Sequence, residues 1–114
     1  MIRRVGGTKR YSDYVIHNNI VYLSGVVSNK ETLLEQTYDV LNQIETLLKE
    51  ANSSKKNILQ MFIYMNDEND YETMNIAFDS WIPDNCAPAR ATFGNIKFPN
   101  SNWKIEIVVS AYIE

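Results

Sequence analysis

The chain has 114 residues, of which 45% are hydrophobic and 11% aromatic, enough for one domain over residues 1–114 that buries roughly two thirds of its unfolded surface. A net charge of −3 argues against nucleic acid as a partner, since phosphate binding needs clustered lysine and arginine. No apolar run reaches the roughly 18 residues that span a bilayer, so we expect no membrane association. The N-terminus has no signal-peptide core, and the single Cys86 fits a reducing compartment, so we expect a cytoplasmic protein.

The first predicted element is a β-hairpin between Tyr11 and Val27. Two runs rich in β-branched and aromatic residues flank Asn18-Asn19, and asparagine tolerates the positive φ that a two-residue turn requires. The segment before Tyr11 has room for one additional strand.

A helix follows the hairpin. Ser28 to Glu31 matches a capping box, and the apolar residues after it recur at helical spacing, which predicts about five turns with one apolar face. The polar stretch from Asn52 to Lys56 ends the helix. The residues predicted on the apolar face are Leu33, Leu34, Thr37, Val40, Leu41, Ile44, Leu47 and Leu48.

The next two elements are a strand and a second helix. The apolar run from Ile58 to Met65 indicates a strand buried on both faces, and therefore central in its sheet. Residues 67–70 can cap a helix that ends before Pro83. One buried stripe on that helix is predicted to contain Tyr71, Met74, Phe78 and Trp81.

Two further strands complete the predicted order ββαβαββ. The first spans Ala89 to Lys97, the turn lies at residues 99–102, and the last strand spans Trp103 to Ile113. Side chains alternate along the last strand, so Trp103 and every second residue after it, up to Ile113, are predicted to face the core. The opposite face carries Val108 and Tyr112 and is too apolar for open water, so a symmetric oligomer is the simplest cover.

Two charged residues in these last strands suggest a site. Arg90 lies between alanines that leave room for a ligand, and its planar fork fits a carboxylate bidentately. Glu106 lies between isoleucines, where a carboxylate is costly unless something compensates it. Together they predict a pocket for a small organic acid. The plainer alternatives are a surface ion pair for Arg90 and a solvated outward position for Glu106.

The two residues do not meet across a simple hairpin. A turn at Asn100-Ser101 would place Arg90 opposite about Ala111, which is about 16 Å along the strand from Glu106 at 3.3 Å per residue. If both serve one site, either the strands are not hairpin partners or the residues come from different subunits.

Few other residues suggest chemistry. His17, the only histidine, precedes the first turn and is expected to be a partly exposed turn residue, so we expect no metal site. Cys86 has no histidine near it in sequence, which argues against a catalytic thiol. Gly25 indicates either a bulge or a close backbone approach to a ligand. Tyr11 is a candidate pocket wall.

Four landmarks, in this order and spacing, resemble the RidA/YjgF family from about Tyr11 to the C-terminus. They are Leu23-Ser24-Gly25, Glu35-Gln36-Thr37 with Val40-Leu41, Met74-Asn75, and Pro88-Ala89-Arg90 with Lys104-Ile105-Glu106-Ile107. The resemblance implies a bacillus chorismate-mutase-like α+β fold, with a mixed sheet packed on two helices. It also implies a homotrimer whose sheets form an inner barrel, with three sites in clefts between subunits.

The same resemblance implies the roles of individual residues. The arginine matching Arg90 binds the substrate carboxylate and the glutamate matching Glu106 positions the attacking water, while Tyr11, the backbone near Gly25, and Thr92 line the site. Four positions depart from the family pattern, so we expect the fold to carry over more safely than the substrate. They are Thr92 for a cysteine, Val108 for a second acidic residue, Lys9-Arg10 for Gly-Pro, and Val26 for a glutamine.

The predicted function is hydrolysis of 2-imino or enamine acids to 2-oxo acids and ammonia, with Arg90 holding the acid and Glu106 orienting water, without metal or cofactor. The alternative is a non-catalytic trimer that binds a small carboxylate, or supports a partner, through the same cleft. A ribonuclease activity is also attributed to the family. The negative net charge and the lack of a histidine acid–base pair argue against it.

Overall fold

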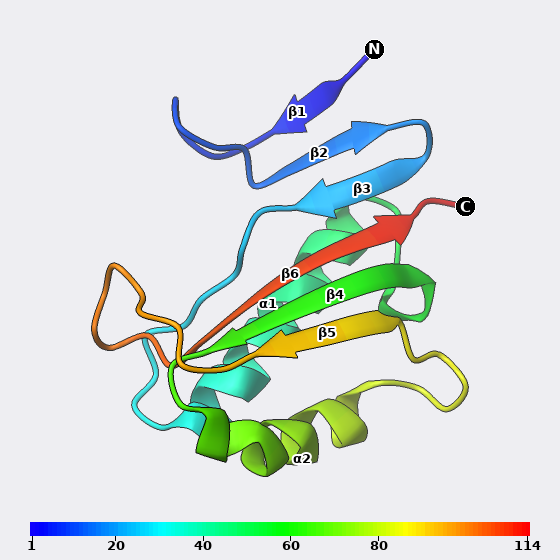
Figure 1. Ribbon diagram of the computed structural model, residues 1–114. Helices are drawn as coiled ribbons and strands as arrows, with labels where there is room; N and C mark the ends of the chain where they lie inside the picture. Colours follow the sequence, from blue (N-terminus) through cyan, green and yellow to red (C-terminus); the bar gives the residue numbers. More distant parts are fainter.

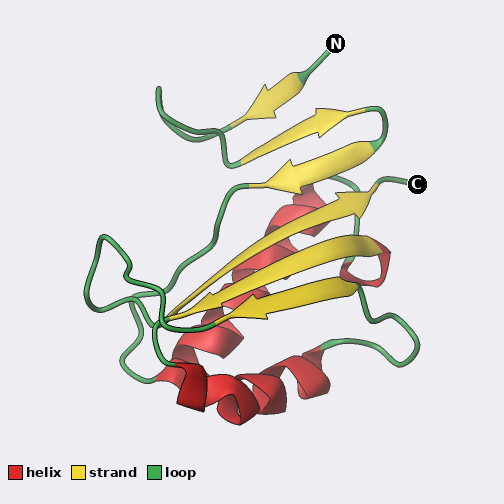
Figure 2. Ribbon diagram, in the orientation of Figure 1, coloured by secondary structure: helices red, strands yellow, loops and turns green.

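In a computed structural model, which describes residues 1–114, both helices pack on one face of a six-stranded mixed sheet (Figures 1 and 2). The strand order is β1-β2-β3-β6-β4-β5. This is the α+β fold that the sequence predicts. Its elements are β1 (Arg3–Val5), β2 (Tyr14–His17), β3 (Ile20–Leu23), α1 (Leu33–Glu50), η1 (Lys55–Asn57), β4 (Ile58–Met65), η2 (Glu68–Asp70), α2 (Tyr71–Trp81), β5 (Ala89–Phe93) and β6 (Ile105–Tyr112).

The predicted hairpin is confirmed. Strands β2 and β3 pair antiparallel with His17 opposite Ile20, and Asn18 and Asn19 between them adopt φ angles of 51° and 62°. Both angles are in the left-handed region that a two-residue hairpin turn requires. The additional strand is β1, which pairs antiparallel with β2 and forms one edge of the sheet.

Helix α1 has the predicted length but a different N-cap. Thr32 caps it, because its Oγ1 accepts the Glu35 N–H at 3.1 Å and the Glu35 carboxylate accepts the Thr32 N–H at 3.2 Å. The predicted cap, Ser28, instead accepts the Lys30 N–H within a turn. The capping-box pattern occurs twice in succession, and the second copy adjoins the apolar run. None of the helices combines the length and apolar character that crossing a membrane requires.

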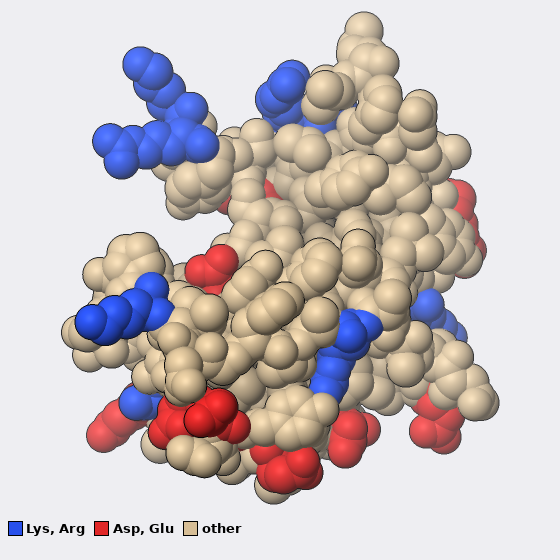
Figure 3. All heavy atoms as spheres, in the orientation of Figure 1, with Lys and Arg blue, Asp and Glu red and all other residues tan.

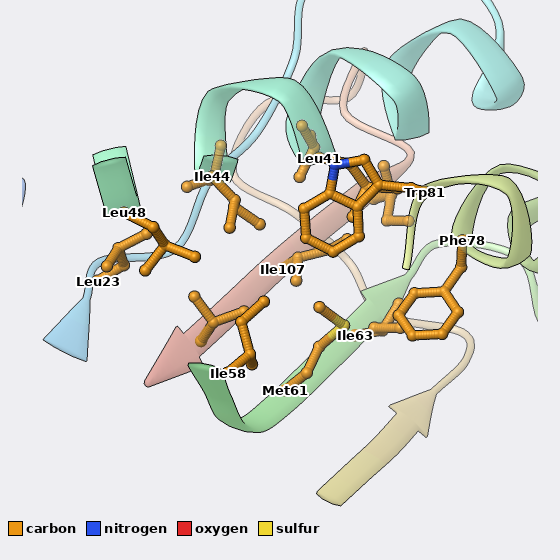
Figure 4. Packing of buried hydrophobic residues seen from close by; sticks show 14 of the residues in the cluster. Leu23, Leu41, Ile44, Leu48, Ile58, Met61, Ile63, Phe78, Trp81 and Ile107 are labelled. Carbon is orange, nitrogen blue, oxygen red and sulfur yellow. The ribbon is translucent and has the colours of Figure 1, made fainter. Parts of the chain in front are cut away.

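The core lies between the helices and one face of the sheet (Figure 4). Leu41, Ile44 and Leu48 of α1 contact this face from above, together with Phe78 and Trp81 of α2. The sheet contributes fully buried residues from β4 and β6. They include Met61, Ile63, Ile105, Ile107, Val109 and Ala111.

Strand β4 spans the predicted residues and is central, between β6 and β5. Its predicted burial on both faces is wrong within the chain, since Phe62 and Tyr64 are half-buried and Gln60 is exposed. These three residues face away from the helices, onto a side that no element of the chain covers. Two helices cover one face only, which leaves the other face open.

This open face is largely uncharged (Figure 3). Tyr64 and Phe93 stack on it with ring centroids 5.3 Å apart, and Val108 lies on the same side of β6. Tyr22 and Tyr112 are 47% and 39% exposed there. Aromatic and apolar side chains gathered on an uncovered sheet face are typical of a surface that another molecule covers.

Strands β5 and β6 differ in part from their predicted forms. Strand β6 alternates buried and outward residues as predicted, but Trp103 precedes it and is only half-buried. Strand β5 ends at Phe93, because Asn95 has a φ of 57° and the Ile96 N–H donates to the Met65 carbonyl. Moreover, β5 pairs in parallel with β4 and not with β6.

Gln36 joins α1 to the loop before β6, an arrangement that the apolar pattern did not predict. Its side chain is fully buried, and its Nε2 donates to the carbonyls of Lys30 and Asn102, both at 2.9 Å. Its Oε1 accepts the Lys104 N–H at 2.9 Å. One amide side chain therefore fixes the start of α1 relative to the entry into β6.

We expect Gln36→Ala to lower the free energy of unfolding by about 2 to 4 kcal/mol, because it leaves the Lys104 N–H without its partner and opens a cavity. Urea unfolding of both proteins at equal concentration measures the difference. The control is Asn42→Ala, an exposed amide on the same helix whose side chain makes no hydrogen bond, expected to change the value by about 0.5 kcal/mol or less. Equal losses in the two variants would contradict this role of Gln36.

Candidate functional site

Gly25 lies in a β-bulge between β3 and β6. Tyr22 pairs with Ser110, and the next bridge joins Val26 to Ile107, so this strand has one residue more than its partner. The Ser24 N–H donates to the Asp13 carbonyl at 3.1 Å and the Val26 N–H to Ile107 at 2.9 Å, whereas the exposed Gly25 N–H donates to no backbone carbonyl. The bulge therefore leaves one backbone donor free for a ligand.

The Glu106 carboxyl packs against this bulge. A Cβ added to Gly25 would lie 2.7 Å from Cδ of Glu106, so a side chain at this position would displace the carboxyl from its present place. Desolvation by burial raises the pKa of Glu106 above 4.5. Both ion pairs of the chain use Glu45, so no cation compensates Glu106. Glu106 points outward on the open face, as in the plainer alternative, but it is half-buried against Gly25 instead of fully solvated.

A hollow of about 180 Å³ adjoins the bulge. Tyr11, Ser24 and Gly25 line it from the strand side, and Gln43 and Leu47 of α1 line the opposite wall. The fold thus brings the predicted site residues Tyr11 and Gly25 to one hollow, although they are separated by the whole of β2 and β3.

Arg90 lies on the other side of the sheet. It pairs with the buried Met61, so its side chain is directed toward α2, where a guanidinium nitrogen donates to the Tyr71 hydroxyl at 3.1 Å. The guanidinium carbon lies 4.8 Å from the centroid of the Phe78 ring and 5.8 Å from that of Tyr71. Arg90 takes part in no ion pair, so the plainer alternative of a surface ion pair is wrong. Its remaining donors are available to an anion.

One chain does not bring Arg90 and Glu106 together. Arg90 is opposite Met61 on β4, whereas Glu106 is opposite Tyr64, three residues further along the same strand and on the other face. The strands that carry them are not hairpin partners, because β4 lies between them. Within the chain, therefore, the site residues form two groups, one with Arg90 and one with Glu106.

Thr92 belongs to the group of Arg90. It follows Arg90 by two residues on β5 and therefore points to the same side of the sheet. It lines a second hollow, of about 260 Å³, whose other walls are Met65, Glu68, Tyr71 and Gly94.

Tyr71 joins the candidate site through its hydrogen bond with Arg90, which the sequence did not reveal. The pattern assigns it to the buried stripe of α2, but it is 42% exposed and binds Arg90. The sequence did contain a pattern that could have indicated this contact, because Tyr71 and Phe78 are seven residues apart and share one helical face. A cation on a strand beneath that face would meet both rings.

His17 and Cys86 remain outside both groups. The Nδ1 atom of His17 lies 3.3 Å from the Met1 carbonyl oxygen at the exposed turn. Cys86 is a half-exposed loop residue whose N–H donates to the Pro83 carbonyl. No group of three or more His, Cys, Asp or Glu side chains is arranged to hold a metal ion.

The raised pKa of Glu106 predicts a pH dependence of stability. Between 4.5 and the higher folded pKa, the folded chain binds more protons than the unfolded chain, so stability falls as pH rises through this interval. The Glu106→Gln variant has no carboxyl to titrate at this position, so it does not lose stability in this way. We therefore expect the free energy of unfolding of the variant, relative to that of the wild type, to increase with pH over the same interval. Urea unfolding from pH 4 to 8 measures it, with the exposed Glu31→Gln as control. A constant difference for Glu106→Gln would contradict the shift.

Comparisons with known proteins agree with this fold over the whole chain. The family model described as endoribonuclease L-PSP matches residues 1–113. A RutC family protein of Haemophilus ducreyi is 39% identical over 99% of this chain and 97% of its own length. Reactive Intermediate Deaminase A of Arabidopsis thaliana is 30% identical over 85% of this chain and 55% of its own length.

The crystal structure of NMB1025, a member of the YjgF protein family from Neisseria meningitidis, superposes with a TM-score of 0.96. It is 40% identical, and the match covers 100% of this chain and 96% of that one. Sequence and structure therefore show that the chain belongs to the RidA/YjgF family.

Proposed function

We propose that the protein hydrolyses 2-imino and enamine acids to 2-oxo acids and ammonia at a site between two copies of the chain. The observation that carries the proposal is the pair of complementary, uncompensated groups. Arg90 has free donors and no acidic partner, and the Glu106 carboxyl has a raised pKa beside the free Gly25 N–H. One relative, the Arabidopsis protein, bears the name of a reactive-intermediate deaminase.

The separation of the two groups makes a second copy necessary. Arg90 is on the edge strand β5, and Glu106 is on the face of the sheet that no element of the chain covers. We propose a homotrimer in which these open faces form an inner barrel. Each of its three clefts then combines Arg90 of one copy with Glu106 of the next.

In the proposed mechanism, Arg90 binds the substrate carboxylate through two parallel N–H donors, which fixes the position of the neighbouring C2 atom. Glu106, ionised, accepts a proton from water as the water oxygen attacks C2 of the protonated imine. The resulting carbinolamine receives that proton on nitrogen, which leaves Glu106 ionised again. As the C–N bond breaks and ammonia leaves, Glu106 takes the remaining hydroxyl proton, the 2-oxo acid forms, and this proton then passes to the ammonia or to water.

The remaining residues would hold the substrate. The Gly25 N–H, which has no backbone acceptor, would donate to the substrate, and Tyr11, which lines the adjoining hollow, would contact it. Burial suits Glu106 to its role, because a base whose pKa approaches the working pH transfers protons more effectively. An enamine first becomes the imine by protonation at C3, and the same steps follow.

A non-catalytic carboxylate-binding protein is the second candidate. The observation that favours it is Val108, which lies on the same face of β6 as Glu106 and is apolar. With Val108 apolar, Glu106 is the one acid left for both proton transfers, from the water and to the leaving nitrogen. Under this alternative, Arg90 and Gly25 bind a 2-oxo acid and no chemistry follows.

Turnover separates these two functions. With imines generated in situ by an amino acid oxidase, we expect catalytic amounts of the wild type to accelerate release of ammonia. Arg90→Ala and Glu106→Gln should each lower kcat/KM by about 100-fold or more. Arg90→Lys should retain part of the activity with a higher KM, since lysine lacks the bidentate fork. Wild-type protein that binds 2-oxo acids without accelerating hydrolysis would establish the second candidate.

Mixed oligomers test whether each site uses two chains. Arg90→Ala and Glu106→Gln chains are unfolded together in equal amounts and refolded, so that both kinds enter one trimer. Since half of the chains carry each defect, about one quarter of the clefts should combine an intact Arg90 with an intact Glu106. We therefore expect about a quarter of the wild-type activity. Each variant refolded alone is the control, and no recovery in the mixture would place both residues in one chain.

A further inference from the structure

The second hollow, beside β5, has no role in the chemistry proposed above. It lies on the helix-facing side of the sheet, between the end of β5 and the start of α2, and has a volume of about 260 Å³. Its floor is Met65, and its walls are Thr92 and Gly94 on one side and Glu68 and Tyr71 on the other. This space suits a side chain of a few heavy atoms, since complete ligand pockets are larger.

The hollow adjoins Arg90. Thr92 and Arg90 are two residues apart on the same side of β5, which corresponds to about 6.6 Å along the strand. Tyr71 connects them, because it lines the hollow and also accepts the hydrogen bond from Arg90. A molecule whose carboxylate binds Arg90 can therefore extend its other end along β5 into the hollow.

The far end of the hollow is acidic. Gly94 has no side chain, and a Cβ there would lie 2.6 Å from Cβ of Glu68 and 2.9 Å from its Cα, so glycine is what lets Glu68 approach β5. Neither ion pair of the chain uses Glu68. Asp67, Asp70 and Glu72 flank it with no basic residue among them, and acidic side chains gather near α2 in Figure 3.

We propose that this hollow binds the side chain of the substrate and that Glu68 selects side chains with a positively charged end. The proposal rests on the function proposed above, since it assumes that Arg90 binds the substrate carboxylate. The preferred ligand is then an imino or oxo acid with an ammonium or guanidinium tail. Its carboxylate binds Arg90, its methylene groups contact Met65 and Tyr71, and its tail meets Glu68.

The expected selectivity is modest, because Glu68 is exposed. An exposed ion pair contributes up to about 1 kcal/mol, which corresponds to at most about fivefold in affinity. An acidic tail meets a like charge and loses a similar factor. We therefore expect a basic ligand to be favoured over an acidic one by about tenfold, and this ratio to shrink in high salt.

The test compares three stable 2-oxo acids by calorimetric titration. They are 5-guanidino-2-oxopentanoate, 4-methyl-2-oxopentanoate and 2-oxoglutarate, which have basic, apolar and acidic tails. The wild type should bind them with decreasing affinity in that order, and kcat/KM for the imines of arginine, leucine and glutamate should follow the same order. Equal affinities, or tightest binding of the acidic ligand, would overturn the proposal.

Variants assign the selectivity to Glu68. Glu68→Gln should weaken binding of the basic ligand about threefold and leave the apolar ligand unchanged, and Glu68→Lys should reverse the order of basic and acidic ligands. The control is Glu72→Gln, which removes the same charge from the same segment but outside the hollow. Equal effects of Glu72→Gln and Glu68→Gln would overturn the proposal.

The two proposals fail in different ways. Without turnover of any imine, the deaminase function fails, whereas the three affinities still decide whether the hollow selects a basic tail. Conversely, equal turnover of all three imines upholds the deaminase and overturns the selectivity. Unchanged affinity of every ligand in Arg90→Ala would overturn the placement of the carboxylate on which the selectivity depends.

Discussion

The antiparallel pairing of β4 with β6 is the constraint on which the rest of the structure depends. The two strands are each eight residues long and pair from Met65 opposite Ile105 to Ile58 opposite Ala111. Because side chains alternate along a strand, this register places one set of large apolar residues under both helices and the other set on the open face. It also fixes Glu106 on the open face and, through the parallel β5, Arg90 on the helix side.

This register explains the division of the candidate site. The cation contacts aromatic rings of α2, and the carboxyl lies against the bulge, in the space that a side chain at Gly25 would occupy. Each group is therefore preorganised by its own local structure, and the energetic cost of leaving each one without a partner is met at folding. A second copy would have only to bring two prepared surfaces together, which is a simple route to a composite site.

Sequence periodicity predicted most of the elements, because burial of an apolar face dictates it. The bounds of β4, the five turns of α1, the asparagine turn and the alternation of β6 all follow from local patterns. The N-cap was misassigned because two capping boxes occur in succession, and only the second is followed directly by the apolar run. The burial of Gln36 could not be predicted, since two of its three partners, Asn102 and Lys104, lie 66 and 68 residues away along the chain.

By itself, the sequence singled out the two residues that we propose carry the chemistry, since a fork-shaped cation and an apolar-flanked carboxylate are visible as residue types. It also pointed to Gly25 as a bulge or a close approach to a ligand, and the structure shows the bulge. Only the tertiary structure decided that β5 joins β4 and that Tyr71 belongs to Arg90. Long-range strand pairing sets the order of the strands, and the helices set which face of the sheet is covered. Neither can be predicted from the local spacing of residues.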